Sequence, residues 1–119
     1  MTGQWRTHSS RRPNAASTSS SAGENESGEY DSAFEKLARA GIRISYYSCS
    51  TGFYIHGKVV EADYGTAGAK IFIGSENFSD TSLNQNRELG LIISSHPVMS
   101  AIADTFASDF RNGKHWSST

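Results

Sequence analysis

The chain has 119 residues, with 11 basic and 12 acidic side chains and a formal net charge of −1. This length allows one domain, and this charge exerts no long-range attraction on nucleic acid or anionic membranes. The single cysteine, Cys49, excludes an intramolecular disulfide and any metal site built from several cysteines. No run approaches the roughly 18 consecutive apolar residues of a transmembrane helix.

These properties predict a soluble protein without a transmembrane segment and without stable nucleic-acid binding. Its compartment stays open, because no signal peptide is visible. The default expectation is cytoplasmic, or secreted if the N-terminus is truncated.

Residues 1–29 read as a disordered tail. They are rich in serine and poor in apolar side chains, so they bury too little surface to offset the entropy of ordering. Residues 1–23 contain arginines and no acid, a composition that also resembles an organellar targeting peptide. We expect the disordered tail and keep targeting as the alternative.

Two helices are expected, one on each side of the strands. Ser32 and Glu35 form a capping-box pattern that predicts a helix over 32–40, and Gly41 is a typical stop. Pro97 suits a helix start, and apolar residues at helical spacing predict a second helix over 97–111. Residues 114–119 should be frayed.

Alternating or continuous apolar runs predict strands over 42–46, 53–60, 70–74 and 88–94, with one helical turn within 79–86. Helix, strands and helix together predict an α/β fold, in which helices flank a mixed sheet of about four strands. The ordered domain should therefore span 30–113.

The segment "YIHGKVV" places a histidine and a lysine two residues apart in a predicted strand. Residues i and i+2 of a strand point to the same face, so His56 and Lys58 should project together. A lysine directed into a covered sheet needs an anionic partner. The pair is therefore a candidate phosphate site.

Further polar groups follow at the ends of the next strands. Ser75 and Asn77 end the strand over 70–74, and Glu88 begins the strand over 88–94. Gly74 should leave open space beside them. A neutral imidazole can attack phosphorus when a carboxylate orients it, and Glu88 is the candidate for that role. Lys58 and Asn77 would neutralise the charge that develops on the phosphate oxygens.

The combined pattern resembles the HKD signature of the phospholipase D superfamily. It comprises His56-x-Lys58 followed by Asp63, then Gly74-Ser75-x-Asn77, then Asn86-Arg87-Glu88-Leu89-Gly90. The resemblance covers roughly residues 33–112. The stretch between Asp63 and Gly74 is longer than is usual in that family. The chain also carries one motif, whereas members of the family build one site from two.

The resemblance implies half of a phospholipase D-like fold and a phosphodiester hydrolase or transphosphatidylase that acts through a phospho-histidine. His56, Lys58 and Glu88 would be catalytic, with His56 as nucleophile or general acid. The substrate would be held by Lys58, Ser75 and Asn77. Asp63 and Gly74 would be structural, and no metal or cofactor is implied.

A single motif implies a partner. The second motif would come from a homodimer or from a missing N-terminal half, and a phospholipid is the expected substrate. Two alternatives stay open, namely a non-catalytic truncated half-domain and a nuclease of the same superfamily.

Overall fold

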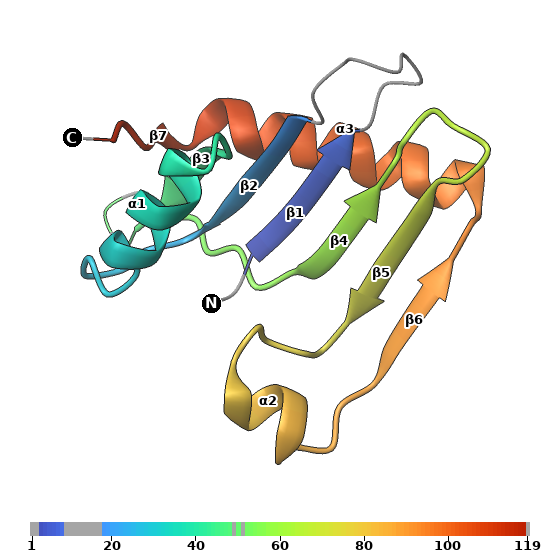
Figure 1. Cartoon of the computed structure of the whole chain (residues 1–119), viewed down its shortest axis with the longest axis horizontal. Coiled ribbons are helices and arrows are strands. Elements are labelled where there is room, and N and C mark those ends of the chain that lie inside the picture. Colours follow the sequence, from blue (N-terminus) through green and yellow to red (C-terminus); the bar gives the residue numbers. More distant parts are fainter. Residues whose placement is uncertain (1–2, 9–17, 49, 51, 119) are drawn as a thin grey trace.

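The computed structural model describes residues 3–8, 18–48, 50 and 52–118. Seven strands form one mixed sheet in the order β6-β5-β4-β1-β2-β3-β7. The strands are β1 (Gly3–His8), β2 (Thr18–Glu24), β3 (Arg43–Tyr47), β4 (Lys58–Ala62), β5 (Lys70–Gly74), β6 (Gly90–Ile93) and β7 (Lys114–His115). Figure 1 shows β6, β5, β4, β1 and β2 side by side in this order.

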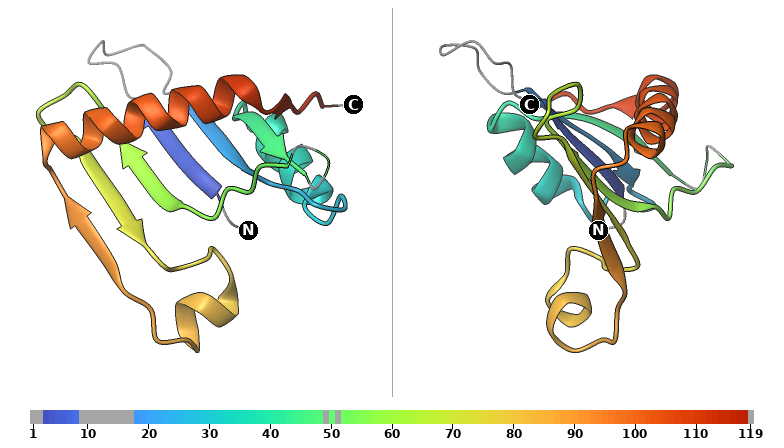
Figure 2. Two further views of the ribbon diagram at one scale, coloured as in Figure 1. Left: turned by 180° about the vertical axis from the view of Figure 1, so that it is seen from behind. Right: turned by 90° about the vertical axis from the view of Figure 1, so that its right-hand side faces the viewer.

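Three helices complete the fold: α1 (Asp31–Arg39), α2 (Asp80–Asn84) and α3 (His96–Asn112). The long helix α3 crosses one face of the sheet, and α1 covers the opposite face near β3 (Figure 2). The short α2 lies beyond the ends of β5 and β6 (Figure 1). The expectation of an α/β fold with a mixed sheet flanked by helices is confirmed, and no described helix is long and apolar enough to cross a membrane.

The core beneath α3 is built from side chains distant in sequence. Ala22, Tyr47, Ile55 and Phe106 are buried together there. The hydroxyl of Tyr47 also donates to the carbonyl oxygen of Asp109 over 2.8 Å, which ties β3 to α3. This contact holds the helix across the sheet.

On the other face, Phe34 of α1 is almost fully buried. Its ring centroid lies 6.1 Å from that of Tyr46 and 5.5 Å from that of Trp116. Trp116 also donates its backbone N–H to Ile44. The prediction that residues 114–119 are frayed is therefore wrong for 114–116, which pair with β3 and pack on α1.

The prediction of a disordered tail over 1–29 is wrong for the described residues of that segment. β1 and β2 pair antiparallel, β1 joins β4, and β2 joins β3, so both strands lie inside the sheet. Ser20, Ser21 and Ala22 are buried although the strand is poor in apolar residues. Its stability comes from two backbone ladders and from small side chains beneath the helices, which composition does not reveal.

The expected capping box is also wrong, because α1 begins at Asp31 and Ser32 lies inside it. The side chain of Asn25 holds the helix start instead. Its Oδ1 accepts from the backbone N–H of Tyr30 over 3.1 Å, and its Nδ2 donates to Asp31 over 2.7 Å. Gly41, with φ +84°, stops the helix as expected.

The strands that carry the motif are shorter than predicted. β4 begins at Lys58 rather than at residue 53, and β6 begins at Gly90, so Glu88 precedes its strand. The strand over 70–74 and the helical turn within 79–86 are as predicted.

Candidate functional site

The sheet register brings the three parts of the motif together. Lys58 of β4 pairs with Gly74 of β5, and Gly74 pairs with Gly90 of β6. These residues form one row across three strands at one end of the sheet. The chain consequently leaves the sheet at the same end of these strands in three places: before Lys58, after Gly74 and before Gly90.

His56 and Lys58 lie in direct contact. The Nζ of Lys58 is 2.9 Å from Nδ1 and 2.7 Å from Nε2 of His56, and it donates to the backbone oxygen of the same histidine over 3.0 Å. A lysine ammonium is only a donor, so of the two ring nitrogens it can donate only to the one that is unprotonated in the tautomer present. The pair thus presents a cation next to a ring nitrogen that carries a lone pair.

The two side chains differ in exposure. The imidazole of His56 is exposed and stacks on Tyr54, with 5.6 Å between ring centroids and 20° between planes. Lys58 is only 5% exposed. Burial lowers the pKa of the Lys58 ammonium, and the charge of Glu88 opposes that shift. A buried cation beside an accessible imidazole is suited to hold an anion against the ring.

Glu88 lies in a network of hydroxyl and amide donors. Ser75 and Ser82 each donate to its carboxylate over 2.5 Å, and Asn86 donates over 3.1 Å. These hydrogen bonds, with that from Ser75 foremost, lower the pKa of Glu88 and keep it ionised. Within the described residues no hydrogen bond joins Glu88 to His56, so Glu88 acts on the pair through its charge on Lys58.

Hydrogen bonds to Leu89 and Ser82 hold Ser75 and Asn77 in place. The backbone N–H of Ser75 donates to the carbonyl of Leu89, and the N–H of Leu89 donates to the Ser75 hydroxyl over 3.1 Å. The backbone N–H of Asn77 donates to Ser82 over 2.9 Å, while its side-chain Oδ1 is buried without a partner. The side-chain oxygen of Asn77 can therefore accept a hydrogen bond from a ligand, and its side-chain nitrogen can donate one to a ligand.

Sequence reasoning missed Ser82. It is buried in the first turn of α2, where its hydroxyl accepts from Asn77 and donates to Glu88. One signal was present, because Ser79 three residues earlier is an N-cap and accepts from the backbone N–H of Ser82. This helix start aims Ser82 toward the loops on either side of α2.

Sequence reasoning also missed Glu24, which lies at the end of β2 within the predicted tail. It is 2% exposed, and its Oε1 accepts from the backbone N–H of Ile55, the residue before His56. Burial raises the pKa of Glu24. Since residues 53–57 lie outside the sheet ladder, this carboxyl replaces a strand neighbour in positioning the segment that carries His56.

Two residues of the motif remain, Asp63 and Gly74. Asp63 lies in the turn at the far end of β4, with φ 55°, and its carbonyl accepts from Thr66 over 3.1 Å. The expectation of open space beside Gly74 is wrong. The carboxylate of Glu76 and the ring of Phe72 fill the space that a Cβ at Gly74 would need.

A family model described as "Cardiolipin synthase, PLD-like domain" matches residues 16–110 of this chain. The match begins within the segment expected to be disordered and ends within α3. No curated protein and no solved structure gives a significant match. The match covers β2, α1, α2, most of α3 and every part of the motif.

Proposed function

Since this chain belongs to the family of phospholipase D-like domains, we propose that it cleaves phosphodiesters through a phospho-histidine on His56. The observation that supports this most is the contact between the buried Lys58 ammonium and the exposed His56 ring. A phosphate seated on Lys58 would lie within reach of a ring nitrogen.

The reaction has two displacements. In the first, a ring nitrogen of His56 attacks phosphorus, the bond to the leaving oxygen breaks, and a second histidine gives that oxygen a proton. In the second, water or an alcohol attacks phosphorus, the nitrogen–phosphorus bond breaks, and the same second histidine takes the proton. Water gives hydrolysis, and an alcohol gives phosphatidyl transfer.

The other polar groups stabilise the charge that develops on the phosphate during the reaction, or hold the groups that do so. Lys58 and the amide nitrogen of Asn77 stabilise the non-bridging oxygens. Ser75 and Glu88 hold the loops of β5 and β6 in place through their hydrogen bonds. The Glu88 charge also favours the ammonium form of Lys58 against burial.

A lipid substrate is supported by large apolar side chains that are exposed beside the motif. Each lies within three residues of a site residue, and the group comprises Phe53, Tyr54, Phe78, Leu83 and Leu89. Leu89, next to Glu88, is 76% exposed. Such a group around a phosphate site suits a substrate that carries both a phosphodiester and acyl chains. The nearly neutral charge of the chain argues against a nuclease, because nucleic-acid grooves are basic.

The second histidine is proposed to come from another copy of this chain, or from a second motif in a longer protein. Size-exclusion chromatography with light scattering, combined with an assay on bis(p-nitrophenyl) phosphate, tests the first version. We expect an active dimer, and we expect His56→Ala to be inactive while the exposed His96→Ala control keeps its activity. An active monomer would contradict the dimer, and an active His56→Ala variant would contradict the nucleophile.

The single motif also favours a second candidate, a non-catalytic half-domain that binds a phosphodiester or a partner chain. This candidate predicts no turnover by the wild-type protein at any concentration. Activity that rises with protein concentration and disappears in His56→Ala would exclude it.

A further inference from the structure

Glu24 is a buried acid to which the proposed reaction assigns no step. It is the last residue of β2 and is only 2% exposed. Burial raises the pKa of its carboxyl and the charge of Glu26 raises it further, while the hydrogen bond from Ile55 opposes the shift. Its Oε2 is buried without a hydrogen-bond partner among the described residues. Burying an acid in this way costs stability, which indicates a role for the one hydrogen bond that it accepts.

That hydrogen bond connects two strands that are not neighbours. β1 lies between β2 and β4, and its first residue, Gly3, pairs with Gly23 on one side and with Lys58 on the other. β2 and β4 are consequently about 10 Å apart, which is two strand spacings. Glu24 follows Gly23, and its Oε1 accepts from the backbone N–H of Ile55, in the segment that leads into Lys58. The Glu24 side chain therefore links the end of β2 to the segment before β4.

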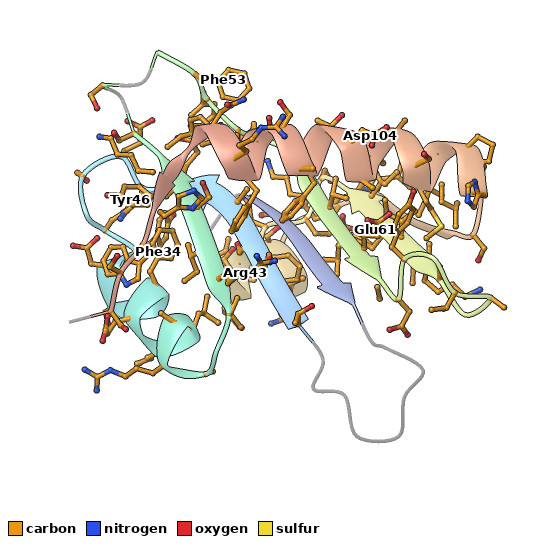
Figure 3. The ribbon with its side chains drawn as sticks, turned by 90° about the horizontal axis from the view of Figure 1, so that it is seen from above. Phe34, Arg43, Tyr46, Phe53, Glu61 and Asp104 are labelled. Atoms are coloured by element: carbon orange, nitrogen blue, oxygen red, sulfur yellow. The ribbon has the colours of Figure 1, made fainter. Side chains whose placement is uncertain are left out.

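This link fixes the backbone just before His56. Residues 53–57 belong to no strand, and Phe53 lies on the loop outside the sheet (Figure 3). The side chain of Ile55 is 4% exposed in the core beneath α3, so both its N–H and its side chain are held. The carbonyl oxygen of His56 accepts from the Nζ of Lys58 over 3.0 Å. The backbone around His56 is thus held by the carboxyl of β2 on one side and by Lys58 on the other.

The two aromatic rings of this segment flank the residue that Glu24 holds. Tyr54 and His56 are two residues apart, so their side chains point the same way in extended backbone. Their rings stack, with 5.6 Å between centroids and 20° between planes. Because Ile55 lies between them, the hydrogen bond from its N–H fixes the backbone from which both rings project.

We infer that Glu24 is a positioning residue, whose hydrogen bond to Ile55 holds the His56 ring where it can attack a phosphate seated on Lys58. The inference rests on the proposed function, in which His56 is the nucleophile. Glu24 bonds to the backbone before His56 and not to its ring, so it acts through geometry and not through proton transfer. Misplacing a reacting group by about 1 Å can slow a reaction about 10²-fold.

The test separates the hydrogen-bond acceptor from the negative charge. We would measure kcat and KM on bis(p-nitrophenyl) phosphate, together with melting temperatures, for wild type, Glu24→Ala, Glu24→Gln and Asn25→Ala. Glu24→Ala removes the acceptor, so kcat should fall about 10²-fold, while KM should not change because Lys58 still binds the phosphate. Glu24→Gln keeps an oxygen that can accept from the Ile55 N–H, so its kcat should stay close to that of wild type.

Asn25→Ala is the matched control. Asn25 is also buried, but its side chain bonds to Tyr30 and Asp31 at the start of α1. This variant should melt at a lower temperature and keep its kcat. If Glu24→Ala does not fold, Glu24→Asp replaces it, because the shorter side chain withdraws the acceptor and keeps the charge. A folded Glu24→Ala or Glu24→Asp with wild-type kcat would overturn the inference, and so would a folded Glu24→Gln that loses as much kcat as they do.

Nuclear magnetic resonance separates this inference from the proposed catalysis. The Ile55 N–H should exchange with solvent about tenfold faster in Glu24→Ala, the typical effect of one lost hydrogen bond, and the ring nitrogen shifts of His56 should change with it. Glu24→Gln should retain the wild-type protection and shifts. These results in a protein that hydrolyses no ester would contradict the catalysis and support the positioning. Equal protection of the Ile55 N–H in wild type and Glu24→Ala would overturn the positioning.

Discussion

The sheet has two lateral ends, one formed by β2, β3 and β7 and the other by β4, β5 and β6, and helices cover them differently. Around β2, β3 and β7, α1 packs on one face and α3 on the other, and Phe34, Tyr47 and Phe106 are all buried. Around β4, β5 and β6, α3 covers one face, and Leu91 and Ile92 of the edge strand are more than half exposed. The polar motif lies entirely at the second end.

This difference separates stability from chemistry. The covered end supplies the aromatic packing that holds the fold, whereas at the open end charged groups such as Lys58 and Glu61 occupy buried positions. We therefore expect substitutions at the open end to change turnover more than stability. The reverse should hold at the covered end.

The largest effect should come from Lys58→Met. It removes the charge that would stabilise the phosphate oxygens, so kcat/KM on bis(p-nitrophenyl) phosphate should fall by about 10²–10³-fold. Stability should not fall. Since burial lowers the Lys58 pKa in the fold, charging this amine costs stability at every pH below that lowered value. A melting temperature well below that of wild type would contradict the separation of the two ends.

The next effect concerns the covered end. Phe34→Ala should lower the free energy of unfolding by about 3–5 kcal/mol, because it empties a site between α1, Tyr46 and Trp116. Urea denaturation measures this. Phe53→Ala is a matched control at an exposed position and should cost less than about 1 kcal/mol. Equal losses in the two variants would show that the covered end does not carry the fold.

A smaller effect is expected from Ser82→Ala. This change leaves the partly buried backbone N–H of Asn77 without its acceptor and removes one donor from Glu88. Activity should fall about tenfold through displacement of the Asn77 loop, with a stability loss of about 1–3 kcal/mol. Ser117→Ala, on the exposed C-terminal segment, should change neither value. A Ser82→Ala variant with wild-type kcat/KM would remove Ser82 from the site.

The smallest effect is a dependence of stability on pH. The hydrogen bonds from Ser75, Ser82 and Asn86 lower the pKa of Glu88 in the fold, so its contribution to stability is present above the ordinary carboxyl pKa of about 4.3. It is lost as the pH falls through the lowered folded value. Melting temperatures recorded between about pH 3 and pH 7 should therefore show a weaker acid dependence in Glu88→Gln than in wild type. Parallel curves would contradict this.

Much of the site was accessible to sequence reasoning, because strand periodicity and residue spacing are local. The helix stop at Gly41, the strand over 70–74 and the short helix before Asn86 follow from adjacent residues. The proximity of Lys58 to the Ser75 loop depends only on neighbouring antiparallel strands.

Contacts between residues far apart in the chain could not be predicted from the sequence. Nothing in the serine-rich composition of β2 indicates that Glu24 would meet Ile55, 31 residues away. The hydrogen bonds of Glu88 to α2 could not be predicted for a related reason, since a residue just before a strand is free to turn toward that helix. The filling of the space over Gly74 depends on Glu76 folding back, and no spacing rule predicts that.

The central claim is that His56 becomes covalently bonded to phosphorus during turnover. Mass spectrometry of protein quenched during turnover of bis(p-nitrophenyl) phosphate tests it directly. We predict a p-nitrophenyl phosphoryl adduct on the peptide that contains His56, and no adduct in His56→Ala. Steady turnover by the wild type with no adduct at His56, together with turnover by His56→Ala, would contradict it.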